Sequence, residues 1–224
     1  MGAGARRVNV SPERRVIPSQ RRPAGEGAAP AGGSNGVRTS SARSADRRQA
    51  SGARRRITTE QMIVLGIDPG LANTGFGVVE RRAGRLVALD GGVVQTLPAS
   101  SPEQRLGELH EALTDLLRVH EPIAMALESL YFGQNARSAF AVGQARGVAM
   151  LCAGQQGVAC FSYTPQQVKG AVCGNGRAPK EQVGRMVAAL LGLTSEPRPD
   201  HAADALAVAI CHANHAPLHA AVAG

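Results

Sequence analysis

Residues 63–70 read IVLGIDPG and place a short strand, a carboxylate and a turn next to one another. The apolar run 63–67 predicts a buried strand that ends at Asp68. The Pro-Gly pair that follows is typical of a turn. A carboxylate at the end of a buried strand is held in place by the sheet, so Asp68 is a candidate functional residue. For one such acid alone, a solvated strand end or a helix cap is the ordinary alternative.

The pattern downstream of this strand predicts a mixed α/β domain. Two further strands, at 76–80 and 86–95, are joined by a turn at Ala83-Gly84, which indicates an antiparallel meander. Leucines at helical spacing then predict a helix over 103–119. The remaining predicted elements are a strand at 123–127, a helix at about 135–155, a strand at 158–162, and helices at 164–172, about 179–191 and 201–214.

Residues 1–61 differ in composition from the rest of the chain. They hold 13 Arg, 4 acidic residues and no aromatic residue, so we expect a disordered Arg-rich tail before a single domain at 62–224. The tail carries +9 and the domain −1, so the basic pI says nothing about what the domain binds. Three explanations of the tail stay open: a basic arm on DNA, an organelle transit peptide, and a true translation start at Met62.

The cysteines and the C-terminal histidines give no metal-binding spacing. Free thiols in a reducing cytosol are the expected state of Cys152, Cys160, Cys173 and Cys211. We interpret His212, His215 and His219 as a solvated helix end and tail. Apolar runs are short and interrupted, so we predict no membrane-spanning helix.

A second strand-end acid and a helical pair accompany Asp68. The fourth predicted strand ends at Glu128, and if it neighbours the first strand, the two carboxylates face each other and need a cation. His201 and Asp204 are three residues apart and share one helix face. The alanines between them let this helix press on the sheet and bring that face over the two acids. Asp200 points elsewhere and suits an N-cap. Each feature taken alone is also compatible with a solvated surface.

Four stretches resemble the successive conserved blocks of the RuvC family of Holliday-junction resolvases. They are LGIDPGLANTGFGV, ALESLYFGQNARSAFAVGQARGVA, TPQQVKGAVCGNGRAPKEQV and DHAADALAVAICHA. They occur in the family's order and span nearly all of residues 63–214, whereas the tail lies outside the match. The resemblance implies a ribonuclease-H-like mixed sheet flanked by helices. Element order alone leaves that fold as one of several α/β arrangements.

The resemblance implies a crossover junction endodeoxyribonuclease that makes paired, symmetric nicks in four-way DNA junctions during recombination and repair. It also implies that Asp68, Glu128, His201 and Asp204 form the active site and bind Mg²⁺, with two ions expected per subunit. Many members carry Asp at the position of His201, and a subset carries His. Because imidazole favours a softer ion, we expect Mn²⁺ to work at least as well as Mg²⁺. If the helix were shifted by one residue, Asp200 could take the active-site position assigned to His201.

Candidate DNA contacts cluster in the middle of the domain. Glu181 is the only acid between residues 137 and 185, and a run of basic residues there can follow DNA backbones. These residues are Arg137, Arg146, Lys169, Arg177, Lys180 and Arg185. Lys169 and Lys180 match positions where the family has functional lysines near the scissile phosphate. For Arg137 and Arg185, an ordinary solvated helix face stays open.

Aromatic and glycine residues suggest further contacts. Tyr131 matches most closely the aromatic wedge that the family stacks on junction bases, with Phe132 left open and core packing as the alternative for either ring. Gly143 and Gly147 permit close helix approach, and the resemblance implies a homodimer through this helix. It further implies a cytoplasmic bacterial enzyme that works with a branch-migration motor of the RuvA–RuvB type.

Three other functions fit the sequence less well. The opening GIDPG resembles the phosphate-binding start of actin-like kinases, but the 163 residues of the domain cannot hold the second domain those need. A ribonuclease H acting on RNA–DNA hybrids fits the acids but not the middle and C-terminal blocks. A junction-binding protein without catalysis is disfavoured because all four candidate ligands are present.

Overall fold

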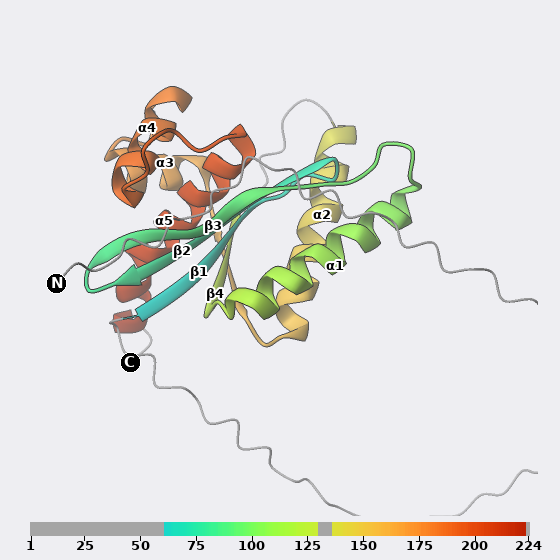
Figure 1. The fold of residues 1–224 in the computed structure, drawn as a ribbon, viewed down its shortest axis with the longest axis horizontal. Helices are drawn as coiled ribbons and strands as arrows, with labels where there is room; N and C mark the ends of the chain where they lie inside the picture. The colour runs from blue at the N-terminus through green and yellow to red at the C-terminus, as the bar shows by residue number, and fades with distance from the viewer. Residues whose placement is uncertain (1–60, 130–135, 223–224) are drawn as a thin grey trace, which may run out of the picture. The chain divides into compact units, whose positions relative to one another are not determined.

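The computed structural model describes residues 61–129 and 136–222. The predicted tail, residues 1–61, therefore lies outside the described residues except for Gln61, which the structure places at the start of the first strand. Figure 1 shows the elements, and the predicted strands and helices are all present in the predicted order. They are β1 (Gln61–Asp68), β2 (Asn73–Arg82), β3 (Arg85–Gln95), α1 (Pro102–His120), β4 (Ala124–Glu128), α2 (Ala136–Gln155), β5 (Ala159–Tyr163), α3 (Pro165–Cys173), α4 (Lys180–Leu191) and α5 (Asp200–Val222).

The strands form one mixed sheet in the order β3-β2-β1-β4-β5. The predicted antiparallel meander is confirmed, because β2 pairs antiparallel with both β1 and β3. Strand β4 pairs parallel with β1, and β5 pairs parallel with β4. In the β1–β4 register Ile67 lies opposite Leu127, so Asp68 and Glu128 occupy the next position on adjacent strands. The acids therefore end two neighbouring strands, as the active-site hypothesis requires.

Helices cover both faces of the sheet, and each face has its own core (Figure 1). On one face, strand residues such as Val64 and Ala126 pack against α3, α4 and α5. On the other face, Ile67 and Leu127 pack against α1 and α2. Side chains alternate along a strand, so the residues after Ile67 and Leu127 point to the face that α5 covers. The strand-end acids are thereby directed toward α5.

Helix α5 lies directly on β1 and β2 because glycines line its path. A Cβ at Gly66 would collide with the carbonyl oxygen of Ala205, and one at Gly77 would lie 2.8 Å from the backbone nitrogen of Leu206. A Cβ at Gly75 would collide with the carbonyl oxygen of His201. This close approach fixes the first turns of α5 beside the end of β1, where the candidate residues lie.

Two local predictions are confirmed and one is wrong. Ala83 and Gly84 both have positive φ, 47° and 77°, as a tight hairpin turn requires. The four cysteines are free thiols. His212, however, is only 3% exposed, and its Nδ1 lies 2.7 Å from the hydroxyl of Tyr163. The sequence predicts a solvated His212 because its pattern ends the helix near residue 214, whereas α5 continues to Val222 and His212 contacts Tyr163 of β5.

No helix within the described ranges has the length and apolar character needed to cross a bilayer.

Candidate active site

Asp68 and His201 meet at the end of β1. Nδ1 of His201 lies 2.7 Å from Oδ2 of Asp68, although the two residues are 133 positions apart in the chain. The Asp68 side chain is 18% exposed and that of His201 47%. The contact joins the end of a central strand to the first turn of α5. The prediction that α5 brings its polar face to the strand-end acid is correct for this pair.

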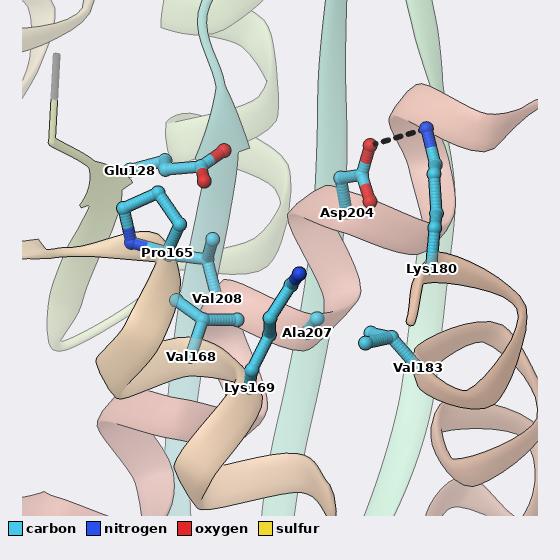
Figure 2. A pocket seen from close by; sticks show the side chains of 9 residues that line it. All are labelled: Glu128, Pro165, Val168, Lys169, Lys180, Val183, Asp204, Ala207 and Val208. Atoms are coloured by element: carbon cyan, nitrogen blue, oxygen red, sulfur yellow. Dashed lines mark ion pairs between the residues drawn. The ribbon is translucent and has the colours of Figure 1, made fainter. Parts of the chain in front are cut away.

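Glu128 and Asp204 line one pocket of about 170 Å³ beside this contact, together with Lys169 and Lys180. Figure 2 shows Glu128 at one side of the pocket, Asp204 at the other, and Lys169 reaching between them from α3. Apolar side chains, among them Pro165, form the remaining wall. Two acids and two lysines thus share a small cavity that is partly closed to water.

Lys180 forms ion pairs at the mouth of this pocket. Its Nζ lies 3.2 Å from Oδ2 of Asp204, drawn as a dashed line in Figure 2, and 3.3 Å from Oδ2 of Asp200. Asp200 also lies 3.8 Å from Arg198. We expected Asp200 to cap α5, but it is the first residue of the helix and its carboxylate binds these cations instead. The ammonium group of Lys180 is therefore paired with the carboxylates of both aspartates.

The electrostatics of the pocket favour a bound cation. Burial, followed by the charges of Asp68 and Asp204, raises the pKa of Glu128 to about 7, against a smaller opposing effect of the lysines. Burial also raises the pKa of Asp204, although Lys180 opposes this. Burial and the neighbouring carboxylates thus disfavour the ionised form of both carboxyl groups. A divalent cation at this position would relieve that repulsion.

The four candidate ligands do not yet converge on one point. Among residues 61–129 and 136–222, no three His, Cys, Asp or Glu side chains are close enough together to hold an ion. Two of the four candidates are instead paired, since Asp68 lies 2.7 Å from His201, whereas Asp204 forms an ion pair with Lys180. The donor set of three carboxylates and one imidazole still suits a divalent cation, because hard oxygen ligands predominate.

The predicted DNA contacts fall into three groups. Lys169 and Lys180 line the pocket with Glu128 and Asp204. Arg177 is exposed on the loop between α3 and α4 and does not line the pocket. Tyr131 lies outside the described residues, and so does the side chain of Arg137. The predicted basic surface is therefore described only in part.

Arg146 belongs to the basic stretch that predicts DNA contacts, but it is half-buried and its guanidinium is hydrogen-bonded to two strand ends. Its Nη1 donates a hydrogen bond of 2.8 Å to the carbonyl oxygen of Glu128, and its Nη2 contacts Oγ of Ser162. Sequence reasoning missed this because a basic residue in a basic stretch looks like a surface residue. The available signal is the helical spacing, because Arg146 lies three and seven residues before Ala149 and Ala153, on the side of the helix that carries small apolar residues.

A mixed sheet of this order, with carboxylates at the ends of β1 and β4 facing one helix, defines the class of ribonuclease-H-like nucleases. A family model described as "Crossover junction endodeoxyribonuclease RuvC" matches residues 64–212. The RuvC of Moorella thermoacetica is 52% identical over 156 residues, which cover 70% of this chain and 93% of that protein. The chain belongs to the RuvC family of crossover junction endodeoxyribonucleases, whose activity depends on metal.

Further relatives agree with this assignment. The RuvC of Rubrobacter xylanophilus is 50% identical over 153 residues, covering 68% of this chain and 86% of that protein. The solved structure of Thermus thermophilus RuvC superposes with a TM-score of 0.66 at 40% identity and covers 70% of this chain and 97% of that one. A second structure of that protein, at TM-score 0.65 and 38% identity over 70% of this chain and 96% of that one, is in complex with a Holliday junction substrate.

Proposed function

We propose that this chain resolves Holliday junctions by making paired, symmetric nicks in four-way DNA during recombination and repair. One observation carries the proposal: Asp68 at the end of β1 contacts His201 of α5, and beside this contact Glu128 and Asp204 line one pocket with two lysines. Phosphodiester hydrolysis needs negative ligands for a metal and positive groups for a phosphate, and both are within this site. The match to RuvC proteins spans nearly the whole domain.

We infer that Asp68, Glu128, His201 and Asp204 are the metal ligands, with two Mg²⁺ ions per subunit. Bound divalent ions would neutralise charge on the phosphate and lower the pKa of a bound water. The chain supplies carboxylates on rigid strands, and burial together with mutual repulsion prepares them for a cation. The imidazole of His201 replaces a fourth negative charge, which supports Mn²⁺ as an equally good ion.

The lysines are assigned to the DNA phosphate. Lys169 extends into the pocket between Glu128 and Asp204, where a phosphate oxygen can approach it (Figure 2). Lys180 forms ion pairs with Asp204 and Asp200. A metal ion that binds the Asp204 carboxylate would displace Lys180, and its ammonium group could then bind a DNA phosphate. Arg137 and Arg177 are proposed to contact the backbone farther from the cut, and Tyr131 to stack on an unpaired base.

Helix α2 is proposed as the interface of a homodimer. Its outer face carries Phe140, Met150 and Leu151, which are 70%, 46% and 54% exposed. Gly147 lies on the same face, and a Cβ there would meet no atom within 4 Å in the single chain. An exposed apolar stripe is typical of a protein–protein interface, and a glycine on it allows a second helix to pack closely. Two sites related by a twofold axis would then face two symmetry-related DNA strands.

The setting of the reaction follows from the family. The relatives described above are bacterial, and we propose that the enzyme acts in the bacterial cytoplasm on junctions processed by a RuvA–RuvB type motor.

A cleavage assay with the full chain tests the function. A synthetic four-way junction, a linear duplex and an RNA–DNA hybrid are each incubated with Mg²⁺ or Mn²⁺, and Asp68→Asn serves as the control. Paired nicks confined to the junction and lost in the variant are expected. Cleavage of the hybrid would assign a ribonuclease H instead, and binding of the junction without cleavage would assign a non-catalytic junction protein.

A further inference from the structure

Arg146 connects helix α2 to the ends of two strands. Nη1 donates a 2.8 Å hydrogen bond to the carbonyl oxygen of Glu128, and Nη2 contacts Oγ of Ser162, on the adjacent strand. Leu127 lies opposite Ser162 in the parallel β4–β5 register. Within the described part of the chain, no carboxylate forms an ion pair with this guanidinium. Its two hydrogen bonds both go to strand ends, one on β4 and one on β5.

The contact fixes the last residue of β4. A hydrogen bond from a charged guanidinium to a carbonyl is stronger than a neutral one, and two donor arms hold the geometry as well as the distance. The other end of the same peptide is held too, because the amide of Ser129 donates a 2.7 Å hydrogen bond to the carbonyl oxygen of Tyr163. Because this peptide is held at both its carbonyl and its amide, and Leu127 and Glu128 pair with β5, the Glu128 side chain has a defined starting direction into the pocket.

Arg146 acts from the opposite face of the sheet. Its helix packs against the core that contains Leu127, whereas the Glu128 side chain enters the pocket under α5. The arginine therefore touches the backbone of a site residue and does not line the pocket. The following residue, Gly147, lies on the exposed stripe of α2 proposed as the dimer interface. Arg146, which contacts the end of β4, is therefore adjacent in sequence to a residue of that stripe.

We propose that Arg146 is a positioning residue that aims Glu128 into the active site and links it to the outer face of α2. The inference rests on the proposed role of Glu128 as a metal ligand. Partners that orient a metal ligand typically contribute about 10- to 100-fold to metal affinity or activity. A DNA-contacting arginine would behave differently, because its loss weakens junction binding and lowers the salt dependence of that binding.

Three variants separate these roles. Arg146→Met removes both donor arms and the charge, and Arg146→Lys keeps the charge but loses the two-armed geometry. Ser162→Ala removes one acceptor at an exposed position and leaves the core intact. Arg185→Met is the matched control, because Arg185 is an exposed arginine of α4 without a described acceptor.

The measurements are Mn²⁺ binding by calorimetry without DNA, junction affinity at several salt concentrations in Ca²⁺, and single-turnover cleavage. We expect Arg146→Met and Arg146→Lys to weaken Mn²⁺ binding and slow cleavage by about 10-fold or more. Ser162→Ala should have a smaller effect in the same direction, and Arg185→Met none on Mn²⁺ binding. Junction affinity and its salt dependence should stay unchanged in the two Arg146 variants.

Unchanged Mn²⁺ binding in Arg146→Lys and Ser162→Ala would overturn the inference, even if Arg146→Met failed to fold. Weaker junction binding with a lower salt slope would overturn it in favour of a DNA contact. Glu128→Gln is measured alongside and should lose most of its Mn²⁺ affinity. If it binds Mn²⁺ as the unmodified protein does, the proposed ligand role of Glu128 fails, which is a result distinct from failure of the Arg146 link.

Discussion

Nδ1 of His201 lies 2.7 Å from Oδ2 of Asp68, so the first turn of α5 is bonded to the end of the central strand β1. In a neutral imidazole only one nitrogen carries a proton. A ring that donates its Nδ1 proton to Asp68 keeps Nε2 as the nitrogen that can bind a metal. The contact thus orients both a carboxylate and an imidazole before any ion is present.

Replacing this histidine should change which metal the enzyme prefers. Imidazole is a softer ligand than carboxylate, so we expect cleavage with Mn²⁺ to be at least as fast as with Mg²⁺ in the unmodified protein. The substitution His201→Asp should narrow the difference by raising the rate with Mg²⁺ relative to that with Mn²⁺. Single-turnover cleavage of a four-way junction in each metal measures the ratio. An identical ratio in the two proteins would show that His201 does not set it.

Much of this site followed from local pattern. Asp68 and Glu128 end apolar runs, and a run followed by an acid indicates a strand end without further information. His201 and Asp204 share a helix face through their spacing. Their assignment as one site came from the family resemblance, because no local pattern states which strands are neighbours. The β1–β4 pairing supplies that missing step.

Other parts of the site depend on tertiary contacts that the sequence does not encode locally. Arg146 and Lys180 are both basic residues in one basic stretch, yet one holds a strand end and the other pairs with two aspartates. Only the packing of α2 and α4 separates these roles. Buried His212 was misjudged for the same reason, since its partner Tyr163 lies 49 residues away.

Stability of the metal-free protein should fall as pH rises toward neutrality. The pKa of Glu128 is raised from 4.5 to about 7, first by burial and then by Asp68 and Asp204. The folded state therefore binds this proton more tightly than the unfolded state between these pH values, and stability decreases with rising pH. Allowing for partial solvent screening, the loss should be on the order of 1–2 kcal/mol. Urea unfolding in EDTA from pH 4.5 to 8 measures it.

Glu128→Gln is the control for this pH dependence, because glutamine cannot titrate. Its free energy of unfolding should change less over the same range, and a decline as steep as in the unmodified protein would assign the effect to another group.

The glycines under α5 should not tolerate a side chain. At Gly66 an added Cβ would collide with the carbonyl oxygen of Ala205, so Gly66→Ala should destabilise the protein by at least about 3 kcal/mol or prevent folding. Gly107→Ala is the matched control, because Gly107 is exposed on α1 with nothing within 4 Å of its Cβ position. That change should stabilise the protein by up to about 1 kcal/mol. Equal melting temperatures for the two variants would contradict the close helix–sheet contact.

The two pocket lysines should differ in their effect on metal binding. Lys180 pairs with Asp204 at 3.2 Å, so Lys180→Met removes a competitor and should strengthen Mn²⁺ binding by about threefold, or about 0.7 kcal/mol. Lys169 has no such pair among the described residues, and Lys169→Met should change Mn²⁺ affinity less. Both variants should cleave junctions about 100-fold more slowly, because each loses a positive group near the phosphate. Calorimetry without DNA measures the Mn²⁺ affinity of each variant. Weaker Mn²⁺ binding in Lys180→Met would argue against competition between Lys180 and the metal for Asp204.

A charge on the outer face of α2 should separate the homodimer into monomers. Leu151 is 54% exposed on the stripe that includes Phe140 and Gly147, so Leu151→Lys would place a charge in the proposed interface. Val119→Lys is the matched control, because Val119 is 64% exposed on α1, outside that stripe. Sedimentation should show a monomer for the first variant and a dimer for the second.

Since Arg146 extends from the same helix to Glu128, the monomeric variant should also bind Mn²⁺ several-fold more weakly. A Leu151→Lys protein that stays dimeric would place the interface elsewhere, and a monomer with unchanged Mn²⁺ affinity would confine the role of Arg146 to the single subunit.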